Sequence, residues 1–291
     1  MADLITLKPR LRDLGGGFSV RRLLPSIERQ GVGPFLFFDH FGPMDVAPDD
    51  NHDVRPHPHI GLSTVTYLFE GAILHRDSVG SVQRIEPGAI NWMTAGRGIV
   101  HSERTPPDLA GRARRSHGLQ LWAALPRAHE EDAPSFTHTP AAAMPTANHG
   151  GAAIRVLIGR AFGAESPVAT LVETLYLDIA LPAGGELVLP RLAPECGLYG
   201  VDHPYRIDGV EVLPHTMAVP DAGTLRISCE TPARIMVVGG EPLDAHRFLW
   251  WNFVSTRKER IHEAADQWQR QAMPRIAGET EWIALPEKRL L

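Results

Sequence analysis

The sequence has little of several features that mark other classes of protein. Cysteine occurs only twice, at Cys196 and Cys229, and the two are far apart and outside any C-x-x-C motif. This excludes a disulfide framework and favours a reducing compartment. No stretch approaches the roughly eighteen apolar residues of a membrane span, and the N-terminal MADLITLKPR lacks the apolar core of a secretory signal. We therefore expect a cytoplasmic protein that makes no membrane contact.

An excess of positive charge is also missing. The formal net charge is −5 at pH 7, whereas a surface that binds nucleic acid usually carries a basic patch, so we expect no direct nucleic-acid partner. Glycine and proline, in contrast, are plentiful, with 27 and 25 residues among 291. That composition is typical of many short strands joined by turns, and the length fits two domains of ordinary size.

Short β-branched and aromatic runs recur between turn signals along the chain. In the first half they predict strands over 64–69, 72–75 and 89–93, separated by Glu70-Gly71 and Pro87-Gly88. In the second half they predict strands over 154–158, 171–179, 186–189 and 234–238. Residues 128–151 contain prolines and small residues without periodicity, so we expect a partly extended crossing between two domains.

Two short strings carry the chemistry. His57 and His59 lie in RPHPHIG, and His101 and Glu103 lie in GRGIVHSE. Each pair has i, i+2 spacing, which on a strand sends both side chains to one face of the sheet. About forty residues separate the pairs and are predicted to form a strand–turn meander, which is long enough to fold back and bring them together. Surface H-x-H pairs are common, so the second pair is what indicates a metal site.

Three imidazoles and one carboxylate make a donor set for a first-row transition metal. A structural zinc site is normally closed by four ligands in a tetrahedron. A six-coordinate metal such as Fe(II) would keep two positions open for a substrate or O2, which favours a catalytic or sensory site. His75 follows on the next strand, and we expect it to make a supporting hydrogen bond rather than to bind the metal.

The same stretch, from Arg55 to Glu103, resembles the first cupin half of the pirin family. FFDHFGP at 37–43 and GGEPLDAHRFLWWNFVSTRKERI at 239–261 are similar to other landmarks of that family. The resemblance implies an all-β bicupin with two face-to-face β-barrels, and it carries the ligand roles onto His57, His59, His101 and Glu103. Ser63 stands where the general cupin pattern has a glutamate, so Glu103 is the expected carboxylate ligand. We expect a metal-binding barrel over 1–135 and a degenerate barrel over 150–291.

The second half is predicted to lack a metal site. A shift of 127 residues places His101 on Ser228, and no histidine occurs at 182–186, where the first pair would recur. Near the C-terminus, a capping box of Thr256 and Glu259 predicts a helix over about 256–272, ended by Pro274. Its apolar face is expected to hold Ile261, Ala264, Ala265, Trp268 and Ala272.

The pirin resemblance implies two functions that the four ligands cannot distinguish. One is a quercetin 2,3-dioxygenase-like enzyme that cleaves flavonols with O2 and releases carbon monoxide, with Glu103 as ligand and proton acceptor. The other is an iron-binding, redox-responsive regulator of a transcription factor or metabolic enzyme. Both imply one divalent metal per chain, with Fe(II) preferred over Ni, Cu, Mn or Zn. The flavonol enzyme is the favoured prediction, and Val65, Tyr67, Trp92 and Met93 are candidate pocket residues whose orientation the sequence leaves open.

Overall fold

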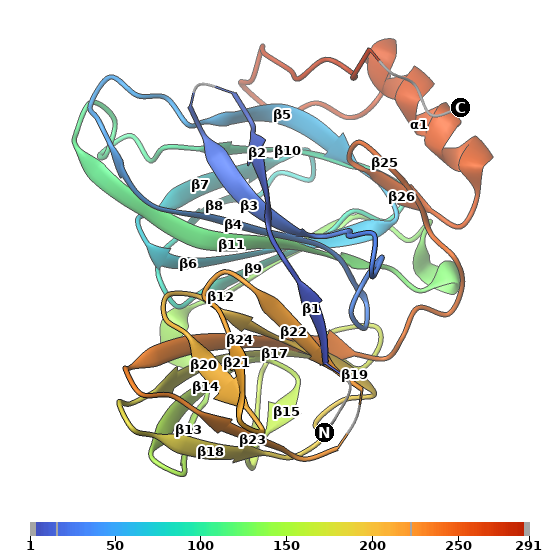
Figure 1. Cartoon of the computed structure of the whole chain (residues 1–291). Coiled ribbons are helices and arrows are strands. Elements are labelled where there is room, and N and C mark those ends of the chain that lie inside the picture. Colours follow the sequence, from blue (N-terminus) through green and yellow to red (C-terminus); the bar gives the residue numbers. More distant parts are fainter. Residues whose placement is uncertain (1–3, 16, 222, 288–291) are drawn as a thin grey trace. The chain divides into compact units, whose positions relative to one another are not determined.

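A computed structural model describes residues 4–15, 17–221 and 223–287 (Figure 1). Most elements are β-strands, and the chain forms two compact units. We call residues 13–20, 40–141 and 243–291 the first barrel unit, and residues 1–12, 21–39 and 142–242 the second barrel unit.

Two sheets build the first barrel unit, and the larger one also includes β2, β3 and the start of β4, whose residues fall partly in the second barrel unit as defined above. A seven-stranded sheet has the order β12-β9-β6-β11-β4-β3-β2, and a four-stranded sheet has the order β5-β10-β7-β8. The bounds are β2 (Arg10–Asp13), β3 (Ser19–Leu24), β4 (Phe35–Val46), β5 (Val54–His59), β6 (Leu62–Glu70), β7 (Ile73–Asp77), β8 (Val82–Ile85), β9 (Ile90–Thr94), β10 (Ile99–Arg104), β11 (Arg114–Ala124) and β12 (Ser135–Thr139). The predicted strands at 64–69, 72–75 and 89–93 correspond to β6, β7 and β9.

The second barrel unit repeats this plan. Its seven-stranded sheet has the order β1-β22-β19-β24-β17-β14-β13, and its four-stranded sheet has the order β18-β23-β20-β21. The bounds are β1 (Leu4–Leu7), β13 (Thr146–His149), β14 (Ala152–Ile158), β15 (Arg160–Ala161), β16 (Ala164–Glu165), β17 (Thr174–Leu181), β18 (Glu186–Leu189), β19 (Glu195–Gly200), β20 (Tyr205–Ile207), β21 (Val210–Val212), β22 (Met217–Pro220), β23 (Leu225–Ser228) and β24 (Ala233–Gly240). All four strands predicted in this half are present.

The pairings of the two small sheets match strand for strand. The strand order of the first small sheet, β5-β10-β7-β8, matches that of the second, β18-β23-β20-β21. In the large sheets, the strands that correspond are β6 and β19, β9 and β22, and β11 and β24. The weak internal repeat of the sequence is therefore a real repeat of topology. The contents of the two barrels differ, because the second one is filled by an apolar core that includes Leu187, Leu189, Leu225 and Ile227.

The compact units group the chain ends differently from the predicted limits of 1–135 and 150–291. The N-terminal strand β1 pairs with β22, so it belongs to the second barrel unit. Residues 243–291 belong to the first barrel unit. The expected crossing is also more ordered than predicted, because β12 and β13 each join a seven-stranded sheet, with short 3-10 turns at Arg127–His129 and Ala141–Ala143. The domain boundaries at 1–135 and 150–291 therefore stay a prediction.

The predicted C-terminal helix is present as α1 (Lys258–Gln269), after the hairpin β25 (Phe248–Trp250) and β26 (Phe253–Ser255) (Figure 1). Ile261, Ala264 and Trp268 are buried as expected, against Ile60 and Val100. Ala272 is exposed and lies beyond the helix. The helix therefore packs beside β10 and the end of β5 in the first barrel unit.

The predicted capping box at this helix is wrong. Arg257 occupies the N-cap position and makes no side-chain cap bond. The hydroxyl of Thr256 instead donates to Glu130, 3.0 Å away, and so does its backbone N–H. Glu130 is buried beside Arg247. The N–H and hydroxyl of Thr256 therefore donate to a residue far away in the sequence, and not within the helix. Within the described residues no helix is long and apolar enough to cross a membrane.

Candidate metal centre

The two predicted pairs lie next to each other on β5 and β10. His57 is directly opposite His101, and His59 is opposite Ile99. Residues directly opposite each other in an antiparallel pair share a face, so His57, His59, His101 and Glu103 all belong to one face of the small sheet. β7 adds a third pair to the same face, because Asp77 is opposite His101 and His75 is opposite Glu103.

A bulge separates the two ends of the β5–β10 pairing. His101 is opposite His57, but Glu103 is opposite Val54, so β5 has one residue more than β10 across this step. A bulge bends a strand and re-aims its side chains, and it tolerates a proline such as Pro56 that cannot donate to the ladder. The bulge therefore lies between the predicted ligands His101 and Glu103, where it affects the direction of their side chains.

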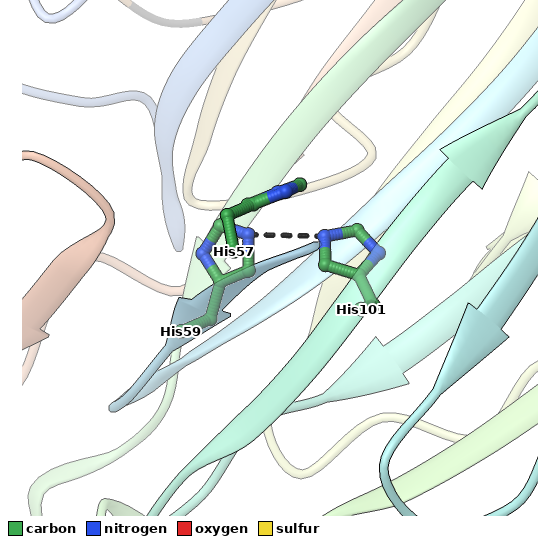
Figure 2. A group of neighbouring side chains, drawn as sticks. All are labelled: His57, His59 and His101. Atoms are coloured by element: carbon green, nitrogen blue, oxygen red, sulfur yellow. Dashed lines mark hydrogen bonds between the residues drawn. The ribbon is translucent and has the colours of Figure 1, made fainter. Parts of the chain in front are cut away.

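The three histidine rings converge (Figure 2). Their possible ligand atoms all lie within 4.8 Å of one another, and all three side chains are buried. The Nε2 atoms of His59 and His101 are 3.1 Å apart. The structure thus brings together the three predicted histidine donors from two strands that are about forty residues apart in the chain.

Hydrogen bonds fix which nitrogen faces the centre. Nδ1 of His57 lies 2.9 Å from the carbonyl oxygen of Arg55, and Nδ1 of His59 lies 3.1 Å from that of Asn252. A carbonyl only accepts, so both Nδ1 atoms carry the proton and both Nε2 atoms carry a lone pair. Ligating histidines almost always donate their other ring N–H in this way. The donor set therefore fits a cation at the point where the Nε2 atoms meet.

Burial makes the cluster neutral. It lowers the pKa of His57 to about 4 and the pKa values of His59 and His101 well below 6.5, and the neighbouring histidines lower the last two further. Neutral imidazole is the form that binds a metal, so no proton must leave these rings at neutral pH. A structural cluster would need hydrogen-bond donors for the three lone pairs, whereas a divalent cation satisfies all of them.

Glu103 is close to the cluster but is not part of it. Among the described residues, the group of donor atoms within 4.8 Å of one another contains the three histidines alone. Glu103 is partly buried, with the side chain of Thr66 nearby, although the Thr66 hydroxyl donates to Oε1 of Gln120 at 2.9 Å. Burial raises its pKa above 4.5. Its role as the fourth ligand accordingly stays a prediction, and a carboxyl with a raised pKa is suited to accepting a proton.

The large sheet supplies the opposite wall of the centre. Trp122 lies edge-on to His59 with 5.1 Å between ring centroids, and Phe136 stacks on His75 at 4.3 Å. Register places Thr64 opposite Trp122 and Met93, and Thr66 opposite Gln120 and Asn91, so these residues form the inner face together with Phe136 and His138.

Of the four candidate pocket residues, only Met93 is on that inner face. Val65, Tyr67 and Trp92 are on the other face, because successive side chains of a strand point to opposite faces of the sheet. Sequence reasoning did not identify Trp122, Phe136, Thr66 or Asn252. Asn252 in particular lies 193 residues from His59 in the chain, within the C-terminal landmark, and it contributes a backbone oxygen that leaves no side-chain signal.

The second barrel has apolar side chains at the corresponding positions. The inner-face pairs of β18 and β23 are Leu187 with Ile227 and Leu189 with Leu225, and all four residues are buried. The shift of 127 residues placed His101 on Ser228, but Ser228 pairs with Glu186 on the outer face. That shift therefore does not place the inner-facing His101 on an inner-facing residue.

Neither cysteine is placed for redox chemistry. Burial raises the pKa of the Cys196 thiol to about 11, and burial raises that of Cys229 as well. The reactive form of a cysteine is the thiolate, so both residues behave as small apolar side chains.

Comparison with known proteins identifies the family. The sequence pattern of the Pirin family matches residues 17–123, and that of the Pirin C-terminal cupin domain matches residues 176–274. The chain belongs to the pirin family. The family and the fold class, an all-β protein of two cupin domains with a C-terminal helix, are thereby confirmed.

Other pirins are similar along most of the chain. A Pirin-like protein of Caulobacter vibrioides is 44% identical over 293 residues, which cover 99% of this chain and 100% of that protein. The Pirin of Rattus norvegicus is 33% identical and covers 89% of each chain. A crystal structure described as quercetin 2,3-dioxygenase from Acinetobacter baumannii is 32% identical, with a TM-score of 0.87, and covers 99% of this chain and 97% of that one.

Proposed function

We propose that this pirin is an iron(II)-dependent dioxygenase that cleaves quercetin-type flavonols with O2 and releases carbon monoxide. The observation that carries the proposal is the convergence of three buried imidazoles on the inner face of the first barrel, two of them oriented by backbone carbonyls. The similarity to a protein described as quercetin 2,3-dioxygenase supports the substrate class. A bound Fe(II) would supply Lewis acidity and open coordination positions for substrate and O2.

In this proposal Glu103 acts both as a ligand and as the acceptor of the acidic enol proton of the flavonol. Its raised pKa and its place opposite His75 support a proton-accepting role. The rings of Trp122 and Phe136 line the same interior and offer apolar surface to a flat aromatic substrate.

The test is anaerobic loading with Fe(II), followed by O2 and a panel of flavonols, with substrate absorbance and released carbon monoxide as readouts. We expect oxygen-dependent loss of flavonol absorbance with a matching release of carbon monoxide. His101→Ala serves as the control, because it removes a ligand without touching the opposite wall. Iron-loaded protein that consumes no O2 with any flavonol would contradict the enzyme.

That negative result would favour the second candidate, a redox-responsive iron protein that regulates a transcription factor or metabolic enzyme. The relatives from Caulobacter vibrioides and Rattus norvegicus are described as pirins without a stated activity, which is compatible with this candidate. The two differ in one measurable respect. A regulator should change its affinity for a protein partner between Fe(II) and Fe(III), and an enzyme should turn over substrate.

A further inference from the structure

We propose that His75 and Asp77 form a relay that keeps the Nε2 atom of His101 free of its proton and available to the metal. The inference deepens the proposed function, because it rests on the metal site. His75 and Asp77 would be positioning residues that act through His101. They lie on β7, directly opposite Glu103 and His101, and both are buried.

The relay begins at Asp77. Its Oδ1 atom accepts the backbone N–H of Val79 at 3.0 Å and that of Ser81 at 2.9 Å. This leaves Oδ2, which lies 3.0 Å from Nε2 of His75. Burial alone would raise the pKa of Asp77, but the hydrogen bonds from His75 and Ser81 outweigh burial and lower it. The carboxylate is therefore an acceptor only, and Nε2 of His75 carries the proton.

The second step runs from His75 to His101. An imidazole with its single proton on Nε2 has a lone pair on Nδ1. In His75 that atom lies 3.5 Å from Nδ1 of His101, a long contact that forms a hydrogen bond only if His101 is the donor. His75 is held in this orientation by Phe136, whose ring stacks on it at 17° between planes.

The third step is at the centre itself. A proton on Nδ1 of neutral His101 leaves a lone pair on Nε2, which points at Nε2 of His59, 3.1 Å away. His59 has its own proton on Nδ1, held by the carbonyl of Asn252. Two lone pairs facing each other at this distance repel unless a cation lies between them. His57 and His59 thus obtain their orientation from backbone carbonyls, and His101 obtains it from a carboxylate through a second histidine.

Asp77→Asn tests the direction of the relay with a minimal change. The amide oxygen can still accept from Val79 and Ser81, but the NH2 group now donates toward His75. His75 must then accept at Nε2 and move its proton to Nδ1, which forces His101 to move its own proton to Nε2. Substitutions at residues that support a metal ligand typically cost about 10–100-fold in metal affinity, and we expect a loss in that range.

The measurement has two independent readouts. Competition with a chelator gives the Ni(II) affinity, and ¹⁵N chemical shifts of labelled histidine in the metal-free protein give the tautomer of His101. We expect an Nδ1 proton in the wild type and an Nε2 proton in Asp77→Asn. The matched control is Asp132→Asn, which changes an exposed Asp–His pair with the same chemistry, 2.7 Å from His129. The control should leave both readouts unchanged.

A second variant, His75→Phe, separates the relay from a purely structural effect. Phenylalanine keeps the stacking on Phe136 but removes both nitrogens, so metal affinity should fall. Adding Asp77→Asn to His75→Phe should then cause no further loss, because Asp77 acts only through His75. Losses that multiply in the double variant would overturn the relay, and so would an Nε2 proton on His101 in the wild type.

The outcomes also separate this inference from the proposed function. If the wild type binds no Ni(II) or Fe(II), the proposed function fails, while the ¹⁵N shifts of His101 still decide the relay. If the wild type binds metal and Asp77→Asn binds it equally well, the relay fails and the metal site stands.

Discussion

Acidification should leave the three histidine ligands almost unaffected down to pH 5.5. A histidine with an ordinary pKa near 6.5 is about ten parts protonated to one part neutral at that pH. Protons would then lower metal affinity about tenfold for each ligand, or about a thousandfold for three. Burial instead lowers the pKa of His57 to about 4 and those of His59 and His101 well below 6.5. A lowered pKa keeps the neutral form at pH 5.5, so the three together should cost less than about twofold.

The assay is Ni(II) affinity between pH 7.5 and 5.5 at constant ionic strength, by competition with a chelator of known pH dependence. Glu103 is the one predicted ligand expected to add a proton, because burial raises its pKa. A plot of the logarithm of the Ni(II) affinity against pH should therefore have a slope of one at most, which corresponds to one proton. Glu103→Gln should remove that slope. A thousandfold loss of affinity at pH 5.5 would refute the reasoning, since it would show three ordinary histidines.

Three further predictions concern single sites. His101→Ala should reduce bound metal, measured by elemental analysis, to background, and full retention would remove this residue from the centre. Wild type should saturate at one metal per chain in a titration, because Leu187 and Ile227 fill the corresponding place in the second barrel; a second tight site would contradict this. Glu103→Gln should lower turnover per bound metal by about 10²–10⁴-fold, as expected for loss of a general base, and equal turnover would discard that role.

A last prediction in this group tests the support under the helix. Glu130 and Arg247 are buried, 3.2 Å apart, and Glu130 also accepts from Thr256. Replacing Glu130 with Gln removes one of the two carboxylates beside the buried guanidinium of Arg247, the other being Asp244, and weakens the acceptor of Thr256. The free energy of unfolding measured in urea should therefore fall by about 1.5–3 kcal/mol. Glu165→Gln, which changes the exposed ion pair with Arg160, should change it by less than about 1 kcal/mol.

The sequence by itself determined the family, the all-β class and the three histidine donors. It could do so because the i, i+2 spacing fixes a common face wherever the segment is a strand, whatever lies around it. Strands such as β6 and β18 were predictable for the same reason, since β-branched runs between turn signals are local features. The third pair, His75 and Asp77, has that same spacing in the sequence; a supporting hydrogen bond was expected of His75, whereas Asp77 was given no role.

Only the tertiary structure decided how the strands are registered and what lies across from them. A shift of one residue turns every side chain of a strand to the other face, which is why Ser228, on the outer face, is not the counterpart of the inner-facing His101. Thr256 had the sequence of a helix cap, but Glu130 takes its donors from a distant part of the chain. The orientation of His59 depends on a backbone carbonyl of Asn252, 193 residues away. Interactions of that kind depend on the fold as a whole, because any residue can supply a carbonyl and only packing determines which one does.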